Sequence, residues 1–301
     1  MAPVGSALDW LRAARPLAHA NIAPPLVLGQ AFAYAETGRF SWTAALFIHL
    51  FGLMDHLYIV FANDYADRET DADNETHTLF SGGSRVLVEG RIEPRSLRRA
   101  AMTMAGGMVA LSIGWGSERP GLIGFALVAI ALLWAYSYPP IRLSYRGGGE
   151  VLQALGLGVT LPLGGYYGQA GSFSGFPWAA LLPLWVLGFA GNIVTALPDE
   201  PSDRRADKRS WPVLRGYVAA RRHAVALIAV GVGLTYFVGP PLSLGARLLV
   251  VGLPLAALAV SLLFIGRAEP SRKGTMLAFL TLLGGAISLV WVTWSVALFL
   301  R

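Results

Sequence analysis

The stretch SWTAALFIHLFGLMDHLYIVFANDYADRETD, residues 41–71, indicates the fold class of this chain. Residues 41–62 form an apolar run long enough to cross the roughly 30 Å hydrocarbon core of a bilayer as a helix. Polar and acidic residues follow at 63–71, and a second acidic stretch, DEPSDRRAD at 199–207, closes another apolar run. Ionisable groups at membrane depth are costly, so acidic clusters at the ends of spanning helices indicate functional sites.

The composition of the 301-residue chain is typical of a polytopic membrane protein. Hydrophobic residues make up 54% of the chain and charged residues only 14%. The chain has no cysteine, which excludes disulfides, zinc–thiolate centres and thiol nucleophiles. The formal net charge of +6 has an explanation in the membrane topology, so we expect no nucleic-acid partner.

The sequence predicts nine membrane spans, at about 17–35, 41–62, 100–117, 121–138, 150–170, 176–197, 224–240, 245–265 and 275–299. With nine spans, all but four of the 24 Lys and Arg residues lie at the N-terminus or in the loops after even-numbered spans. The positive-inside rule then places the N-terminus in the cytoplasm and the C-terminus outside. We therefore expect one all-α domain over residues 1–301, integral to the cell (inner) membrane.

The two longest loops, about 63–99 and 198–223, fall on the predicted cytoplasmic side and carry the two acidic clusters. Long polar loops in an otherwise tight membrane protein usually hold function. Phosphorylated metabolites are made in the cytoplasm, so we expect an active site facing that side.

The first acidic cluster has a helical spacing. Asn63, Asp67 and Asp71 are four residues apart and form one stripe on a helix, with His56 near the same face deeper in the bilayer. An amide and carboxylates facing one cavity suit Mg²⁺ with a substrate's diphosphate. The alternative is a solvated helix end with Arg68 in a surface ion pair. Asp64, off the stripe, either joins the metal site or caps the turn.

The second cluster repeats the spacing with Asp199, Asp203 and Asp207. Pro201 is tolerated in the first turn of a helix, so the span should break at Pro198 and a short helix should begin near Asp199. Asp199 could then be only an N-cap, which makes Asp203 the better metal ligand. The basic residues that follow, including Lys208 and Arg209, are candidate diphosphate partners, although positive-inside topology alone would explain several of them.

A third segment, YSYPPIR at 136–142, brings Tyr136, Tyr138 and Arg142 to the same membrane face. The tyrosines are either an interfacial aromatic belt or a surface that stabilises a carbocation, with Arg142 holding diphosphate. The Gly-rich stretch SGGSR at 81–85 could cradle phosphate. His19 and Asn21 in the first span either line a cavity or bond neighbouring helices.

Taken together, these segments resemble the UbiA superfamily of intramembrane prenyltransferases over nearly the whole chain. The superfamily motif N-D-x-x-D-x-x-x-D is matched by Asn63, Asp64, Asp67 and Asp71, and the motif D-x-x-x-D by Asp199 and Asp203. The Tyr136–Arg142 segment and the pair Arg15-Pro16 are also similar to the superfamily. The resemblance implies nine transmembrane helices around a central cavity, with the motifs facing each other under a cytoplasmic cap made by the loops 63–99 and 198–223.

The resemblance also implies the chemistry. Mg²⁺ would bind an isoprenyl diphosphate whose tail lies among apolar helices, and ionisation would give an allylic carbocation that an aromatic acceptor captures. The expected metal ligands are Asn63, Asp64, Asp67, Asp71, Asp199 and Asp203. The expected catalytic residues are Asp67, Asp71, Asp203 and Tyr138. The expected substrate-binding residues are Asn63, Arg68, Tyr136, Arg142, Lys208, Arg209, His56 and Asn21.

The run DRRADKRS at 203–210 resembles the D-R-x-x-G-K-R-T run of menaquinone-pathway members, which implies 1,4-dihydroxy-2-naphthoate or a related quinone precursor as the acceptor. Asp207 stands where that run usually has Gly, and Pro201 interrupts the second motif. Other superfamily members prenylate other acceptors, and some cyclise a prenyl diphosphate with no acceptor.

A cation-coupled transporter is a further alternative, but it predicts acidic residues near the bilayer midplane, where only Asp55 fits. The expected partners are therefore a prenyl diphosphate, an aromatic acceptor and membrane lipid. The sequence defines no oligomeric state.

Overall fold

The structure is a computed structural model that describes residues 5–301, and helices are the only regular secondary structure in that range. The rods of the bundle are α2 (Ala23–Thr37), α3 (Trp42–Ala72), α4 (Pro94–Gly114), α5 (Leu122–Ser137), α7 (Gly149–Leu155) continued by η2 (Gly156–Thr160) and α8 (Leu161–Ala170), α9 (Leu181–Ala196), α12 (Tyr217–Thr235), α13 (Leu244–Ser261) and α14 (Lys273–Phe299). Short helices connect them: α1 (Ala7–Ala14), η1 (Pro16–Asn21), α6 (Leu143–Arg146), η3 (Trp178–Ala180), α10 (Glu200–Arg205) and α11 (Trp211–Arg215).

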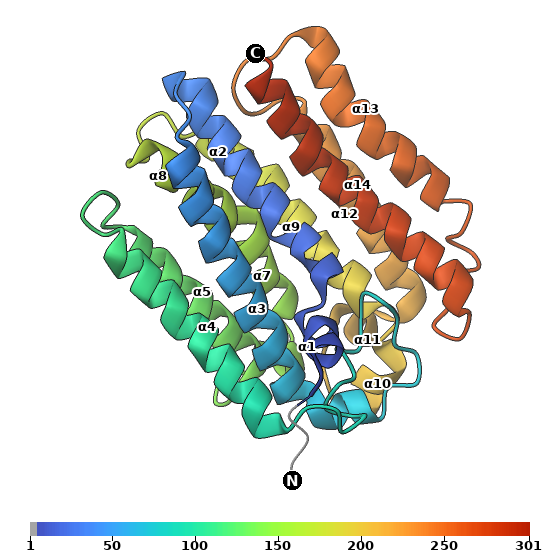
Figure 1. Cartoon of the computed structure of the whole chain (residues 1–301). Helices are drawn as coiled ribbons and strands as arrows, with labels where there is room; N and C mark the ends of the chain where they lie inside the picture. Colours follow the sequence, from blue (N-terminus) through green and yellow to red (C-terminus); the bar gives the residue numbers. More distant parts are fainter. Residues whose placement is uncertain (1–4) are drawn as a thin grey trace.

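The rods lie side by side, with α1, α10 and α11 at one end of the bundle and the C-terminus at the other (Figure 1). This confirms the all-α prediction. Five of the described helices are long and apolar enough to cross a membrane: α3, α9 with η3, α12, α13 and α14. The remaining rods coincide in position with predicted spans but are short, interrupted or begin with charged residues. The nine-span count and the sidedness of the termini stay predictions.

Helix α3 sets the depth of the acidic cluster. The Ser41 hydroxyl accepts a hydrogen bond from the Ala44 amide and caps the first turn. At 1.5 Å per residue the 31 residues of α3 extend about 46 Å, well beyond a hydrocarbon core of about 30 Å. The last turns of α3, with Asn63 to Asp71, therefore project past the apolar segment.

The two predicted cap segments are largely helical. Residues 63–72 continue α3, because no Gly or Pro interrupts them, and α4 already begins at Pro94 in the favoured first helical position. Within the first segment, 63–99, only residues 73–93 lack regular helix. The loop predicted at 198–223 contains α10, α11 and the start of α12. The break after α9 and the helix starting after Asp199 agree with the prediction.

Small residues bring α2 and α8 into backbone contact. A Cβ atom on Gly29 would lie 2.8 Å from the Tyr166 amide nitrogen, and one on Gly165 would lie 3.1 Å from the Leu26 carbonyl carbon. Close approach through small residues is the usual way in which helices pack inside a membrane. This contact anchors α8, whose rod is interrupted by the π-helical segment η2 next to the central cavity.

Candidate active site

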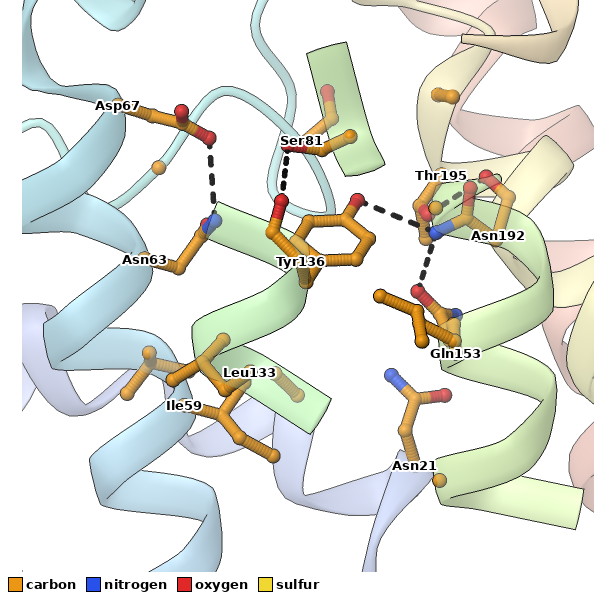
Figure 2. A pocket seen from close by; sticks show the side chains of 18 of the residues that line it. Asn21, Ile59, Asn63, Asp67, Ser81, Leu133, Tyr136, Gln153, Asn192 and Thr195 are labelled. Atoms are coloured by element: carbon orange, nitrogen blue, oxygen red, sulfur yellow. Dashed lines mark hydrogen bonds between the residues drawn. The ribbon is translucent and has the colours of Figure 1, made fainter. Parts of the chain in front are cut away.

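A cavity of about 300 Å³ lies between α3, α5, α7, α9 and α10. Figure 2 shows Asp67 and Ser81 at one end of the cavity and Asn21 toward the other, with the apolar side chains of Ile59 and Leu133 across the cavity from Asn21. Both acidic stretches line the first end, which is the end of the bundle that carries α10 and α11. A polar mouth over an apolar interior suits a molecule with one charged end.

The first acidic stretch contributes one face of α3. Asn63, Asp67 and Asp71 all line the cavity, as their four-residue spacing predicts. The Asn63 amide donates a hydrogen bond of 3.2 Å to Asp67 (Figure 2). Asp64 lies behind this face and is buried; its Oδ2 accepts from the Ser84 amide at 3.1 Å, and its Oδ1 makes no hydrogen bond but lies 3.8 Å from the Arg15 guanidinium.

The second stretch faces the first from α10. Asp199 accepts hydrogen bonds from the Asn74 amide at 2.7 Å and from the Gly82 backbone at 3.2 Å. Asp203 accepts one from the Ser210 hydroxyl at 2.7 Å. Both line the cavity, and burial raises the pKa of both carboxyls, to about 7 for Asp203. The third acid of this stretch, Asp207, lies outside the cavity lining in a left-handed turn.

Lys208 joins the two acidic stretches. Its ammonium lies 3.1 Å from Asp67 and 3.8 Å from Asp203, and its side chain is only 10% exposed. Burial alone would lower the pKa of Lys208, but the two carboxylates outweigh it and raise the pKa. The lysine therefore stays charged and supplies a fixed cation inside the polar end of the cavity.

Tyr145 supports this arrangement from behind. Its hydroxyl donates to Asp67 Oδ1 at 3.1 Å and lies 2.7 Å from the Thr70 hydroxyl. The Lys208 ammonium lies 4.8 Å from the centre of the Tyr145 ring, and the Arg142 guanidinium lies 3.4 Å from it. Arg142, expected to hold diphosphate, is thus stacked on Tyr145 and lies outside the cavity lining.

The two predicted tyrosines point in different directions. Tyr136 lines the cavity, where its hydroxyl accepts from the Asn192 amide at 3.4 Å, and the same amide donates to Gln153 at 2.7 Å (Figure 2). Tyr138 donates to the Ala62 carbonyl at 2.8 Å and packs away from the cavity. Of the pair, only Tyr136 is placed to contact a substrate.

The remaining predicted substrate-binding residues also divide into those that line the cavity and those that lie outside its lining. His56 and Asn21 line the deep end of the cavity. Arg68 instead donates to the Tyr65 carbonyl at 2.8 Å and to Glu69 at 2.9 Å on the outer face of α3, and Arg209 also lies outside the cavity lining. Arg68 therefore forms an ion pair at the surface, as the alternative considered for it in the sequence analysis expects.

The polar end has the chemistry of a divalent-cation site. Within residues 5–301 no three His, Asp or Glu side chains form a preformed metal cluster. Nevertheless, carboxylates from both stretches face one cavity, and a buried Asp64 oxygen lacks a hydrogen bond. Oxygen donors of this kind fit Mg²⁺, so the metal ligands expected from the sequence are compatible with the fold.

The sequence interpretation missed three cavity residues, Asn74, Gln153 and Asn192, and it noted Arg15, which also lines the cavity, only as part of a family-like pair. Asn192 and Gln153 lie within predicted spans, and polar residues at such depth are a recognised signal of function. The Gly-rich stretch, considered only as a weak candidate, does contribute Ser81, Gly82 and Gly83 to the polar end.

Comparisons with known proteins agree with this geometry. The UbiA prenyltransferase family model matches residues 22–283. The chain is 31% identical over 274 residues to the 1,4-dihydroxy-2-naphthoate octaprenyltransferase of Mycobacterium tuberculosis, covering 90% of this chain and 88% of that protein. It is 28% identical over 211 residues to the 2-carboxy-1,4-naphthoquinone phytyltransferase of Synechocystis, covering 68% of this chain and 65% of that protein.

The fold also matches a solved structure. A UbiA homologue from Archaeoglobus fulgidus, bound to GPP and Mg²⁺, aligns with a TM-score of 0.71 at 20% identity, covering 97% of this chain and 100% of the other. The chain therefore belongs to the UbiA prenyltransferase family, integral membrane enzymes that transfer alkyl groups.

Proposed function

We propose that this enzyme catalyses the Mg²⁺-dependent transfer of an isoprenyl group from a prenyl diphosphate to an aromatic acceptor, 1,4-dihydroxy-2-naphthoate or a related quinone precursor. The similarity over most of both chains to a protein named as a 1,4-dihydroxy-2-naphthoate octaprenyltransferase supports this acceptor class. We further propose nine spans and an active site that faces the cytoplasm across the cell membrane, supported by the distribution of Lys and Arg along the chain.

The polar end of the cavity would bind the diphosphate. Arg15 and Lys208 line this end and supply two cations, and the Gly82–Gly83 backbone lies against the same space. Mg²⁺ held by Asp67, Asp71, Asp199 and Asp203, together with Asn63 and Asp64, would neutralise charge on the diphosphate as it departs. Tyr145 and Ser210 hold Asp67 and Asp203 in place for this role.

The apolar middle of the cavity would hold the isoprenyl chain next to the charged end. Ile59, Leu133, Leu157 and Leu161 line it and exclude water from the reacting carbon. The Tyr136 ring faces the same space, where the electron-rich face of a phenol attracts a developing carbocation. Water exclusion and the aromatic face together favour capture of the cation by an organic acceptor.

One observation favours a transferase over an acceptor-free cyclase. Asn192, Gln153 and Tyr136 form a polar wall in the otherwise apolar middle of the cavity (Figure 2). Two amides and a phenol carry five polar hydrogens, of which two bond within the wall, so three remain for a ligand. A hydrocarbon substrate would leave these donors unpaired, whereas the oxygens of a carboxylated aromatic would accept them.

Product analysis tests the proposal. Purified enzyme in detergent would be incubated with Mg²⁺ and geranylgeranyl or farnesyl diphosphate, with and without aromatic acceptors including 1,4-dihydroxy-2-naphthoate. We expect mass spectrometry to detect a prenylated aromatic only when acceptor is present. Asp67→Asn should abolish it, whereas the matched Asp73→Asn, at an exposed carboxylate two residues beyond the motif, should not. A terpene formed without acceptor would establish a cyclase instead.

A further inference from the structure

Asp55 is a carboxyl group without a partner in the middle of α3. It lies eight residues before Asn63, which places it about 12 Å deeper along the helix. The residue is 4% exposed, and its enclosed Oδ1 makes no hydrogen bond to any of residues 5–301. An unpaired carboxyl at this depth costs free energy whether it is charged or neutral, so a purely structural role gives no reason for it.

The surroundings of Asp55 leave one direction from which a partner can approach. Asp55 lies in the wall shared by the central cavity and a smaller chamber of about 30 Å³. That chamber is lined by apolar side chains such as Leu26, Phe51 and Phe125. Its one hydroxyl, on Thr160, donates to the Leu155 carbonyl at 2.9 Å. A hydrogen-bond donor for Asp55 therefore has to come from the central cavity.

His56, next to Asp55, adds a second acceptor to this end. Its Nε2 lies 2.7 Å from the Ala14 carbonyl oxygen, and since a carbonyl only accepts, Nε2 must carry the hydrogen. In the neutral ring Nδ1 then keeps its lone pair. Asn21 lines the same end, and its amide makes no hydrogen bond in the part of the chain that the structure describes.

The two polar regions of the cavity therefore differ in character. The wall of Tyr136, Gln153 and Asn192 offers hydrogen-bond donors, whereas the deep end adds the free acceptor atoms of Asp55 and His56 to the amide of Asn21. A hydroxylated aromatic carboxylate offers both complements: carboxylate oxygens for the wall and a hydroxyl hydrogen for the deep end. An isoprenyl tail offers neither.

We propose that Asp55, with His56 and Asn21 beside it, forms the subsite for a ring hydroxyl of the aromatic acceptor, and that Asp55 accepts the hydrogen bond from that hydroxyl. This inference rests on the proposed prenyl transfer. It orients the acceptor, with its hydroxyl toward the deep end and its carboxylate toward α7 and α9, so that the ring lies beside the space where the allylic carbon would sit.

Steady-state kinetics with Asp55→Asn and Asp55→Leu test the subsite. Losing a hydrogen bond to a carboxylate should raise the acceptor KM about tenfold to a hundredfold for Asp55→Leu, and less for Asp55→Asn, which retains an acceptor oxygen. The apparent KM for the prenyl diphosphate should stay within about twofold, because its site lies at the opposite end. Met54→Leu, one residue earlier on α3 and packed away from the cavity, is the control.

Thermal unfolding in detergent separates this role from a structural one. Without substrates, Asp55→Leu should unfold at the same or a higher temperature than the wild type, because an unpaired buried carboxyl has been removed. The naphthoate should stabilise the wild type but not this variant. A wild-type acceptor KM in Asp55→Leu, or a less stable variant that loses both substrates equally, would overturn the subsite. A wild-type enzyme that forms no acceptor-dependent product would instead refute the proposed function itself.

Discussion

Replacing Lys208 by Gln should disturb both stability and substrate binding. The Lys208 ammonium lies 3.1 Å from Asp67 and 3.8 Å from Asp203 and is almost completely shielded from solvent. Removing one partner of a buried ion pair typically costs about 3–5 kcal/mol, because the remaining charge is left uncompensated. Since the polar end of this cavity can admit water and cations, we expect the lower end of that range, about 3 kcal/mol.

The assay compares thermal unfolding in detergent with a chelator and with Mg²⁺. We expect Mg²⁺ to recover part of the loss, because a divalent cation compensates the same two carboxylates that Lys208 pairs with. The apparent affinity for prenyl diphosphate should fall at least about tenfold, the effect of losing one charge-assisted hydrogen bond. Lys273→Gln is a matched control, since the chain's other lysine is exposed at the start of α14.

A Lys208→Gln variant within about 0.5 kcal/mol of the wild type, the range of ordinary surface substitutions, would refute this reasoning. An equal loss of unfolding free energy in Lys208→Gln and Lys273→Gln would refute it as well. Either result would mean that Lys208 does not hold the two acidic stretches together.

Three further substitutions probe separate parts of the cavity. Tyr145→Phe removes the hydrogen bond to Asp67 and should lower turnover about tenfold at unchanged folding, measured under saturating substrates; full activity would contradict a positioning role. Asn192→Leu breaks the polar wall and should raise the acceptor KM more than the diphosphate KM, so an equal effect on both would argue against acceptor binding there. Gly165→Leu inserts a side chain between α8 and α2 and should lower the unfolding temperature in detergent by several degrees, while a neutral effect would show that the two helices can separate.

Helical periodicity explains how much of the site could be predicted from the sequence. The four-residue spacing of Asn63, Asp67 and Asp71 places them on one face of α3 wherever that helix packs. The rule does not extend from Tyr136 to Tyr138, because α5 ends at Ser137 and Tyr138 already has an extended backbone. Local spacing therefore predicts which residues of a single helix face the site.

Contacts between elements were not predictable in this way. Asn192 on α9 meets Gln153 on α7 across 39 residues, and Tyr145 reaches Asp67 across 78. Arg142 was expected to hold diphosphate, but its left-handed turn stacks it on Tyr145 instead. These partners depend on how the helices pack, which single-sequence periodicity does not contain.

The most direct test of the central claim is equilibrium binding of a non-reactive prenyl thiodiphosphate analogue to the purified enzyme, with and without Mg²⁺. The two acidic stretches are claimed to act as one diphosphate site, so binding should require Mg²⁺ and be lost equally in Asp67→Asn and Asp203→Asn. Asp73→Asn should bind as the wild type does. Binding that is independent of Mg²⁺, or that survives either motif substitution, would contradict the account.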